Sequence, residues 1–312
     1  MIDCLELLAF TIGILIFLRQ FWRILVVISR LYFGTKVTTQ RYGENSWAIV
    51  TGSTDGIGKR IAIELAKRGF NIVQIARNPE KLQAVSQEIQ QKHNRQTRDI
   101  VFDFGKDVTF KSYQDLIQRV ADLDVSVVVN NVGMCNDPNK FENTLPKDHL
   151  NECIVNCYPM VMFTKVVIDK LKQRYAEKKL RTLILNVSSL AVNIPQSYLA
   201  SQCGTKMLCD RFSKSLNYEM RGSGIDMLTL QPGMVSTNRT GFEATKQGVV
   251  TPEQCAVGAL NNATSFETFG TFSHEIMNLF VLNLIMDFIP WKYVMIISRK
   301  IGENLVFKRK QA

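Results

Sequence analysis

The segment from Ser188 to Lys206 carries side chains whose types and positions could do chemistry. It reads SSLAVNIPQSYLASQCGTK, and it begins where the apolar run Leu183–Val187 ends. That run predicts a strand, and a long helical pattern follows the segment. In an open α/β sheet, ligands bind outside the carboxyl ends of the strands. We therefore expect the Ser188 and Ser189 hydroxyl groups and the Lys206 ammonium group to converge on one crevice.

The spacing within this segment is specific. It resembles the active-site segment of the short-chain dehydrogenases/reductases, where a serine stands thirteen residues before a tyrosine and the tyrosine four before a lysine. Ser189 and Lys206 fit this spacing, but the residue at the tyrosine position is Gln202. The resemblance implies an α/β fold, a Rossmann-type doubly wound parallel sheet, with Ser189, Gln202 and Lys206 in catalytic positions.

The glutamine changes what this segment can do. Reduction of a carbonyl group needs a hydride from a nicotinamide and a proton for the developing alkoxide. A tyrosine, with a pKa of about 10, supplies that proton when a lysine one helical turn away favours the phenolate. The Gln202 amide can donate a hydrogen bond to an oxyanion, but it does not titrate. Tyr198 precedes Lys206 by two helical turns, about 12 Å along a helix axis, which is too far for direct tuning.

A strand, a glycine-rich turn and a helix open the predicted domain. The apolar run Trp47–Thr51 leads into TGSTDGIG, and an amphipathic helix is expected over Lys59–Arg68. Gly52 permits the tight turn, Gly56 lets the backbone approach a pyrophosphate, and Gly58 allows the helix to pack closely on the sheet. The predicted cofactor-binding residues of this loop are Gly52, Ser53, Asp55, Gly56, Ile57 and Gly58.

The residue after the second expected strand indicates which dinucleotide is bound. The strand Asn71–Ala76 ends in Arg77, where NAD-preferring folds carry an acid for the ribose hydroxyl groups. An arginine there suits a 2′-phosphate. The sequence therefore predicts NADP(H), and a solvated charge at the strand end is the alternative interpretation of Arg77.

Four further residues match the family by position. Asp103 matches the acid near the adenine, and Asn130, in the sequence NNVG, would brace the sheet and the cofactor loop. Asn156 matches the asparagine that completes the catalytic tetrad through a water relay. Thr237 matches the threonine of the turn that covers the nicotinamide carboxamide. The other expected elements are helices over 80–92, 147–175 and up to about 220, and strands over Arg98–Phe102, Val125–Val129 and Asp226–Leu230.

The N-terminal apolar run predicts a membrane anchor. Residues 7–18 are apolar, but a membrane-spanning helix requires about 20 residues. A helix that spans the membrane would therefore also include residues 2–6, or its arginine side chains would extend to the membrane surface. A buried helix is the alternative, and Asp3 and Glu6 argue against a secretory signal. The basic residues after the run place the following domain in the cytoplasm.

The C-terminal part is expected to associate with a membrane or to cover an acyl pocket. The run 276–297 is apolar but is interrupted by Asn283, Asp287, Pro290 and Lys292, so it is not one clean span. The last five residues, KRKQA, resemble the KxKxx retrieval signal of endoplasmic reticulum membrane proteins. The predicted organisation is a membrane anchor and basic linker over 1–45, an NADP-binding domain over 46–260 and an apolar, membrane-associated tail over 261–312.

Composition excludes several classes of protein. The 312 residues are 46% hydrophobic and 21% charged, which permits a large core and argues against disorder. The net charge of +10 is spread along the chain without an aromatic-interleaved basic block, so we do not expect nucleic acid as a partner. The seven cysteines have no metal-like spacing and are expected to be free thiols, with Cys153 and Cys157 on one buried helix face. The three histidines are scattered, and we expect no metal site.

The flanking segments narrow the resemblance. A hydrophobic N-terminal anchor, TGSTDGIGK, NNVG and a basic C-terminus are similar to the membrane-bound very-long-chain 3-oxoacyl-CoA reductases, also described as 17β-hydroxysteroid dehydrogenases. This implies a lipophilic keto substrate, an acyl-CoA or a steroid, and a homodimer or a fatty-acid elongation complex as assemblies. Arg239 and Lys246, in the expected substrate lid 238–250, favour the phosphate-bearing CoA.

Two functions remain open at this point. One is an NADPH-dependent ketoreductase at the endoplasmic reticulum membrane, with its catalytic domain in the cytosol and altered proton donation. The other is a catalytically inactive NADP(H)-binding scaffold or sensor of the same fold, because a branch of this subfamily lacks the tyrosine. Gln202 is the residue that discriminates between them.

Overall fold

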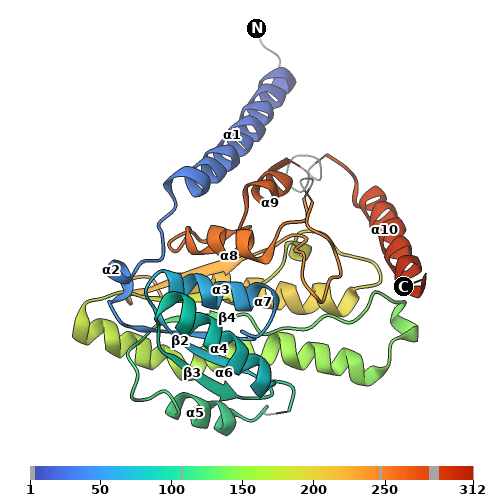
Figure 1. Cartoon of the computed structure of the whole chain (residues 1–312). Helices are drawn as coiled ribbons and strands as arrows, with labels where there is room; N and C mark the ends of the chain where they lie inside the picture. Colours follow the sequence, from blue (N-terminus) through green and yellow to red (C-terminus); the bar gives the residue numbers. More distant parts are fainter. Residues whose placement is uncertain (1–3, 107, 246–247, 281–287, 312) are drawn as a thin grey trace.

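A parallel sheet of seven strands lies at the centre of the molecule, with helices packed around it (Figure 1). The structure is a computed structural model that describes residues 4–106, 108–245, 248–280 and 288–311. The strands lie in the order β3-β2-β1-β4-β5-β6-β7, and every pair of neighbours is parallel. Their bounds are β1 Trp47–Thr51, β2 Asn71–Ala76, β3 Thr97–Val101, β4 Val125–Asn130, β5 Thr182–Val187, β6 Ile225–Leu230 and β7 Glu267–Thr268.

Helices cover both faces of the sheet, because its central strands are apolar on both sides. Ala48 and Val50 pack in a core with α3, α4 and α8, whereas Ile49 between them packs in a second core with α5, α6 and α7. The alternation follows from the two-residue period of a strand. The helices are α1 Cys4–Phe33, α2 Thr39–Tyr42, α3 Gly56–Lys67, α4 Pro79–His93, α5 Phe110–Gln118, α6 Pro146–Lys178, α7 Ala200–Glu219, α8 Pro252–Leu260, α9 Phe272–Met277 and α10 Trp291–Gln311.

The strand order places the candidate site. The chain leaves β1 toward β2 on one side and later continues from β4 on the other side, so the order reverses between β1 and β4. In doubly wound sheets, ligands bind at this switch point, outside the carboxyl ends of the strands. The predicted Rossmann-type fold is therefore confirmed, and the residues after β1, β4, β5 and β6 all lie at the same edge.

The predicted elements agree with the structure except at their ends. Helix α3 begins three residues earlier than expected because Asp55 caps it, its carboxylate accepting a hydrogen bond from Gly56 N at 2.7 Å. Strand β3 begins and ends one residue earlier than expected. The prediction for the cysteines of α6 is half right: all seven cysteines are free thiols, but Cys153 is exposed and Cys157 only half-buried. That face of α6 meets solvent at its N-terminal end.

Several short or amphipathic elements had no counterpart among the expectations. Helices α5 and α8 were not expected, although Thr251 and Gln254 form a capping box at the start of α8. Strand β7 has two residues, too few for a recognisable pattern, and it pairs with Thr229 and Leu230 of β6. The sheet therefore continues past residue 260, the expected end of the nucleotide-binding domain. Asn283 and Asp287, two of the four residues that interrupt the apolar tail, lie outside the described residues.

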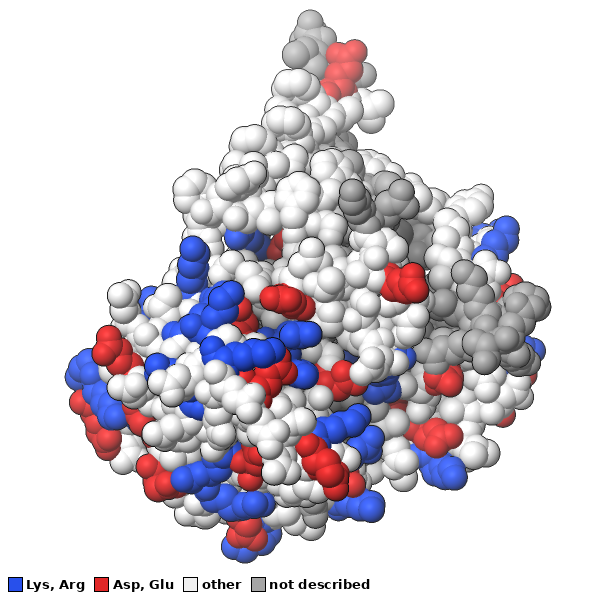
Figure 2. All heavy atoms as spheres, in the orientation of Figure 1, with Lys and Arg blue, Asp and Glu red and all other residues white. Residues whose placement is uncertain are grey.

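Helix α1 projects from the domain (Figure 1). It is 30 residues long, and 6% of its most apolar 18-residue stretch is buried. Figure 2 shows the projection white along most of its length, above a domain where acidic and basic residues are interspersed. Of the described helices, α1 alone has the length and composition of a membrane span. Its exposure is the opposite of what a helix buried in the core would show.

Buried ion pairs join the base of α1 to the domain. Arg30 lies 3.2 Å from Glu267 of β7 and 3.2 Å from Glu275 of α9, and the Glu275 side chain is 2% exposed. Lys214 of α7 also pairs with Glu267, at 2.6 Å. Ion pairs that are partly buried and shared among several partners hold the side chains in a fixed relative position. These contacts favour a helix that stays attached to the domain over a removable signal segment.

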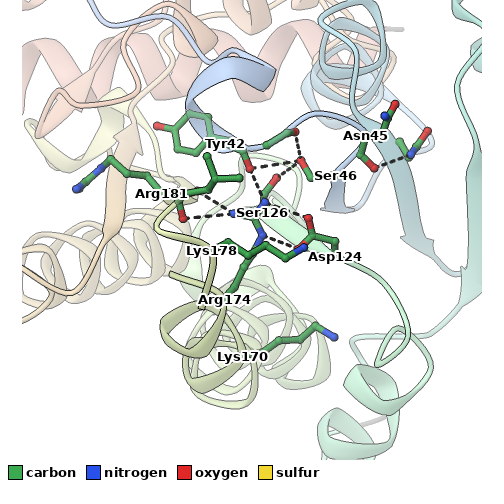
Figure 3. Close-up of polar contacts among 12 residues, drawn as sticks. Tyr42, Asn45, Ser46, Asp124, Ser126, Lys170, Arg174, Lys178 and Arg181 are labelled. Carbon is green, nitrogen blue, oxygen red and sulfur yellow. Dashed lines mark hydrogen bonds and ion pairs between the residues drawn. The ribbon is translucent and has the colours of Figure 1, made fainter. Parts of the chain in front are cut away.

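A second polar network ties the linker to the opposite end of the sheet (Figure 3). Arg174 of α6, 4% exposed, donates to both carboxylate oxygens of Asp124 and to the Tyr42 carbonyl oxygen at 2.7 Å. Ser46 and Ser126 share a hydrogen bond of 2.7 Å beside it. This network lies before the strands β1 and β4, away from the candidate site, and it holds the segment that follows α1 against the domain.

Candidate active site

The glycine loop between β1 and α3 has the tight geometry expected of a phosphate-binding turn. Gly52 has φ of 65° and Gly56 φ of 54°, a region that side-chain-bearing residues rarely adopt. A Cβ atom on Gly58 would lie 2.3 Å from the Gly52 carbonyl oxygen and 2.2 Å from Asn131 Nδ2. Gly52 therefore forms the tight turn and Gly58 packs closely against it as expected, and the approach of a pyrophosphate at Gly56 stays a prediction.

The side chains of this loop fit a dinucleotide. The Ser53 hydroxyl group is fully buried, and it has no hydrogen-bond partner among the described atoms. An unpaired buried hydroxyl group costs free energy unless a ligand satisfies it. Gly56 and Ile57 open α3, whose N-terminal N–H groups suit an anion. This cradle is the observation that favours a bound pyrophosphate.

The loop after β6 closes over the glycine loop. The position of a Cβ on Gly56 is 3.3 Å from the Thr237 methyl group, and Asn238 donates to both Asp55 carboxylate oxygens at 3.1 Å. Thr237 itself is held by Thr240, whose Oγ1 accepts from Thr237 N at 3.0 Å. The predicted nicotinamide-side residue is thus beside the predicted phosphate loop.

Two predicted adenosine-side residues lie at the ends of neighbouring strands. Arg77 follows β2 and is exposed. Asp103 follows β3, which pairs with β2, and its carboxylate accepts from Gly105 N at 3.0 Å. Both therefore sit at the edge of the sheet where the glycine loop lies.

Asn130 and its neighbour divide the task that was predicted for Asn130 alone. Asn130 is buried and donates to Asn186 Oδ1 at 2.8 Å and to Thr164 Oγ1 at 3.0 Å, so it braces β4 against β5 and α6. The residue that braces the cofactor loop is Asn131, which donates to the carbonyl oxygens of Thr51 and Gly52. In the sequence, the pair of asparagines at the end of the expected strand was the signal that could have identified Asn131 as a site residue.

Asn156 and Lys206 both lie close to Gly133. From the position of a Cβ on Gly133, Asn156 Oδ1 is 3.2 Å away and Lys206 Nζ is 3.5 Å away. Lys206 is 7% exposed, and its ammonium group donates to the Val187 carbonyl oxygen at 3.2 Å. The structure therefore brings these two predicted catalytic residues, from α6 and α7, to the loop that follows β4.

Ser189 lies at the carboxyl end of β5, where it was expected. It caps the short helix Leu190–Val192, and its Oγ accepts from Ala191 N at 3.1 Å. The preceding Ser188 donates to the Lys206 carbonyl oxygen at 3.0 Å, which fastens the start of this segment to α7. Ser189 thus keeps its hydroxyl proton available as a donor toward the crevice.

The Gln202 side chain points toward α6. One terminal atom of its amide lies 3.1 Å from each of three groups: Asn156 Nδ2, the Met134 carbonyl oxygen and Glu152 Oε1. If this atom is oxygen it accepts from Asn156, and if it is nitrogen it donates to the other two. The amide therefore occupies a junction between the loop after β4 and two turns of α6.

Tyr198 does not substitute for the missing tyrosine. Its hydroxyl group donates to Glu303 of α10 at 3.2 Å, and its ring lies against Gly302 of the same helix. Ser298 of α10 also bonds the Pro195 carbonyl oxygen and Ser197 N, both at 3.0 Å. The segment before α7 is thus fastened to the C-terminal helix, which directs Tyr198 away from Lys206.

Glu152 is a functional candidate that the sequence did not single out. It lies one turn before Asn156 on α6, and it is 2% exposed. Asn136 donates to it twice, from N at 3.2 Å and from Nδ2 at 3.1 Å. Burial raises the pKa of this carboxyl group, and the bonds from Asn136 with the charges of Arg239 and His149 offset part of the rise.

A cavity of about 50 Å³ lies on the other side of Glu152. Among the residues that line it are Asn136, His149 and Ser201. His149 Nδ1 and Ser201 Oγ share a hydrogen bond of 2.7 Å. The cavity has room for more than one water molecule, and Glu152 itself is among its lining residues.

Residues 46–248 match the sequence model of the short chain dehydrogenase family, so the chain belongs to this family. Two relatives are similar over most of the chain. The very-long-chain 3-oxoacyl-CoA reductase of Meyerozyma guilliermondii is 32% identical over 260 residues, 79% of this chain and 76% of the relative. The human 17-beta-hydroxysteroid dehydrogenase type 3 is 34% identical over 238 residues, 74% of this chain and 73% of the relative.

Solved structures share the fold. A 3-oxoacyl (acyl-carrier-protein) reductase from Agrobacterium tumefaciens with NADP bound has a TM-score of 0.64 at 20% identity, over 78% of this chain and 97% of that one. A short-chain dehydrogenase from Sphingobium yanoikuyae in complex with NADPH has a TM-score of 0.60 at 20% identity, over 68% of this chain and 81% of that one.

Proposed function

We propose that this chain reduces a long-chain 3-oxoacyl-CoA to the 3-hydroxyacyl-CoA with NADPH at the endoplasmic reticulum membrane. The observation that carries the proposal is the convergence of Ser53, Gly58, Asn156 and Lys206 on the carboxyl edge of the sheet. A phosphate cradle and a lysine–asparagine pair at one edge are the two halves of a reductase site. The relatives named above act on a 3-oxoacyl-CoA or, by name, on a 17-beta-hydroxysteroid.

The residues of the chain would each perform a defined step. Bound NADPH would supply the hydride. The Lys206 ammonium group has three N–H donors and gives one to Val187, which leaves donors for the ribose hydroxyl groups. The hydroxyl group of Ser189 would hold the substrate carbonyl oxygen, as would the Gln202 amide through an N–H group. Stabilisation of the oxyanion by these donors is separate from delivery of a proton.

The preference for an acyl-CoA over a steroid rests on charge. Arg239, in the loop after β6, donates to the carbonyl oxygens of Gly133 and Cys135 and so lies over the candidate crevice. A guanidinium group at this place suits a phosphate-bearing substrate. Lys246, the other basic residue of the expected lid, lies outside the described residues. The homodimer and the elongation complex remain predictions.

A second function, a cofactor-binding scaffold or sensor without turnover, is favoured by Gln202 itself. The cofactor loop serves both functions equally. Turnover of a 3-oxoacyl-CoA by the unmodified chain separates them, because the scaffold binds NADPH and oxidises none of it.

We expect NADPH to bind more tightly than NADH, through Arg77. Loss of a charge-assisted hydrogen bond of about 1.5 kcal/mol would weaken NADPH binding about tenfold in Arg77→Ala. NADH binding should not change. Nucleotide fluorescence titration measures both constants, and Lys81→Ala, an exposed cation at the start of α4, is the matched control. Equal affinities for the two nucleotides in the wild type would remove the 2′-phosphate site.

We also expect α1 to anchor the chain with its domain in the cytosol. Arg19, Arg23, Arg30, Lys36 and Arg41 all lie on the C-terminal side of its apolar stretch. Leu15 is 60% exposed within that stretch, and an arginine there would cost about 2.5–3.5 kcal/mol of insertion free energy. Leu15→Arg should therefore move the protein into the soluble fraction on carbonate extraction. Tyr32→Arg, at the helix end, should not.

Orientation and compartment need separate measurements. In microsomes with intact membranes, added protease should degrade the domain, and a protected domain would reverse the proposed orientation. Removal of the two lysines of the KRKQA terminus tests retention in the endoplasmic reticulum.

A further inference from the structure

We propose that His274 is a positioning residue for the cofactor site, because its buried ring holds the loop after β6 over the glycine loop. The proposal rests on the NADP(H) binding that both proposed functions share, and not on turnover. It starts from α9, a short helix to which the sequence analysis assigned no role.

The loop after β6 leaves the sheet and returns through a narrow neck, formed by residues 233–236 and 248–250. Two backbone hydrogen bonds join the sides of this neck: Val250 N donates to the Met234 carbonyl oxygen at 3.1 Å, and Ser236 N donates to the Val250 carbonyl oxygen at 2.8 Å. The two sides of the neck therefore move together.

The His274 ring lies across the neck. Gly233 N donates to Nδ1 of the ring at 3.2 Å, and Nε2 donates to the Gly248 carbonyl oxygen at 3.1 Å. The ring is also packed tightly, since a Cβ atom on Gly233 would lie 2.8 Å from its Cδ2 and Nε2 atoms. His274 is 0% exposed, so water does not compete for these bonds. One side chain thus fastens both sides of the neck to α9.

Both bonds are made by one neutral form of the ring. Because the Gly233 N–H group needs an acceptor, Nδ1 carries no proton and Nε2 carries the only one. The Phe269 carbonyl oxygen, 3.3 Å from Nδ1, receives no proton from this form. Burial lowers the pKa of His274 below the ordinary histidine value, although the Gly248 and Phe269 carbonyl oxygens and the charge of Glu275 raise it. The lowered pKa agrees with the neutral ring.

The helix that carries the ring is itself fixed. Glu275, the next residue, accepts from Thr268 Oγ1 at 3.0 Å and from Phe269 N at 2.9 Å, both at the end of β7. Its other carboxylate oxygen pairs with Arg30 of α1. The sheet and the base of α1 therefore set the place of the His274 ring, and the ring in turn sets the place of the neck.

Beyond the neck, the same loop meets the glycine loop. Thr237 stands four residues after Gly233, and its methyl group lies against Gly56; Asn238 donates to the Asp55 carboxylate. Without the His274 ring, Gly233 N and the Gly248 carbonyl oxygen would lose the hydrogen-bond partner that the structure gives each of them. A buried backbone group without a partner favours conformations in which water reaches it. The neck would then shift and carry Thr237 away from the glycine loop.

Cofactor affinity of the detergent-purified full-length chain gives the first test. His274→Phe keeps a ring but removes both hydrogen bonds, and it should weaken NADPH binding about tenfold in a fluorescence titration. Ser126→Ala is the matched control, because it removes a buried hydrogen bond to Ser46 at the opposite end of the sheet. It should leave the affinity unchanged. NADPH affinity in His274→Phe equal to that of Ser126→Ala would overturn the proposal.

Two conservative variants separate the hydrogen bonds from the bulk of the ring. The amide of His274→Gln can donate to the Gly248 carbonyl oxygen in place of Nε2, and the amide of His274→Asn can accept from Gly233 N in place of Nδ1. Each should bind NADPH about threefold more tightly than His274→Phe does, since each restores one bond. The same loss of affinity in all three variants would overturn the role assigned to the two bonds.

Hydrogen exchange gives a readout at the neck itself. Without cofactor, the Ser236 and Val250 amides should exchange faster in His274→Phe than in the wild type or Ser126→Ala, because their bonds hold the neck closed. The amides of β4 should exchange as in the wild type, which shows that the sheet is intact. Unchanged exchange at Ser236 and Val250 would contradict the proposal.

The outcomes for His274 and for the proposed function are distinguishable. A wild type that binds NADPH and is indifferent to His274→Phe removes only the role of His274. A wild type that binds NADPH without reducing a 3-oxoacyl-CoA, and whose affinity falls in His274→Phe, removes the reductase function and supports the role of His274.

Discussion

The Gln202→Tyr chain is expected to oxidise NADPH with a long-chain 3-oxoacyl-CoA about 10²-fold faster than the wild type. A well-placed general acid contributes about 10²- to 10⁴-fold, and the expected increase is the lower end of that range. The groups that would serve a phenol are present: Lys206 one turn away on α7, Ser189 at the end of β5, and Asn156 across from it. An increase of 10²-fold corresponds to about 2.7 kcal/mol of barrier.

The pH dependence of this variant provides its own control. The rate of Gln202→Tyr should fall as pH rises through the pKa of the phenol, because only the protonated phenol donates a proton. Gln202→Asn shortens the side chain without adding a titratable group and should not increase the rate. Equal rates for the wild type and Gln202→Tyr would show that another group already donates the proton with full effect.

Replacing Gly58 with alanine is expected to weaken NADPH binding by about 10- to 100-fold. The added Cβ would meet the Gly52 carbonyl oxygen at 2.3 Å and Asn131 Nδ2 at 2.2 Å, so the glycine loop or the loop after β4 must move. Overpacking of this kind costs about 1–3 kcal/mol. If the free energy of NADPH binding becomes less favourable by the same amount, the affinity falls by about 10- to 100-fold. Fluorescence titration with NADPH measures it.

Gly204→Ala is the control for this substitution. Gly204 is exposed on α7, and a Cβ there meets no atom of the described residues within 4 Å. An alanine in a helix interior is neutral or stabilising, so cofactor binding should be unchanged. If Gly58→Ala binds NADPH as tightly as Gly204→Ala does, the loop is not the phosphate site.

The sheet was predictable because its strands are short apolar runs that end in punctuating residues. Asn71–Ala76 was predicted with its observed bounds, and the tight turn at Gly52 was predicted where the structure has one. Two-residue β7 was missed because it is too short to show a period. Helix α5 was missed although the apolar residues among its nine residues recur at helical spacing. The strands were therefore predicted correctly where the apolar pattern of the sequence coincides with burial in the sheet.

The site was predictable only where chemistry follows from spacing along the chain. Ser189, Gln202 and Lys206 stand on one segment, so their intervals could be read directly. Glu152 is 50 residues from Gln202 in sequence, and only the packing of α6 against α7 puts its carboxyl group at the amide. In the sequence alone, Glu152 is one polar residue in a long helix.

Transfer of deuterium from C4-deuterated NADPH to a long-chain 3-oxoacyl-CoA, followed by mass spectrometry of the thioester, tests the central claim most directly. The purified full-length wild-type chain should yield a 3-hydroxyacyl-CoA that carries one deuterium at C3, more slowly than Gln202→Tyr does. Unlabelled 3-oxoacyl-CoA recovered unchanged from a wild-type chain saturated with the cofactor would contradict the claim and leave a protein that binds NADPH without reducing its substrate.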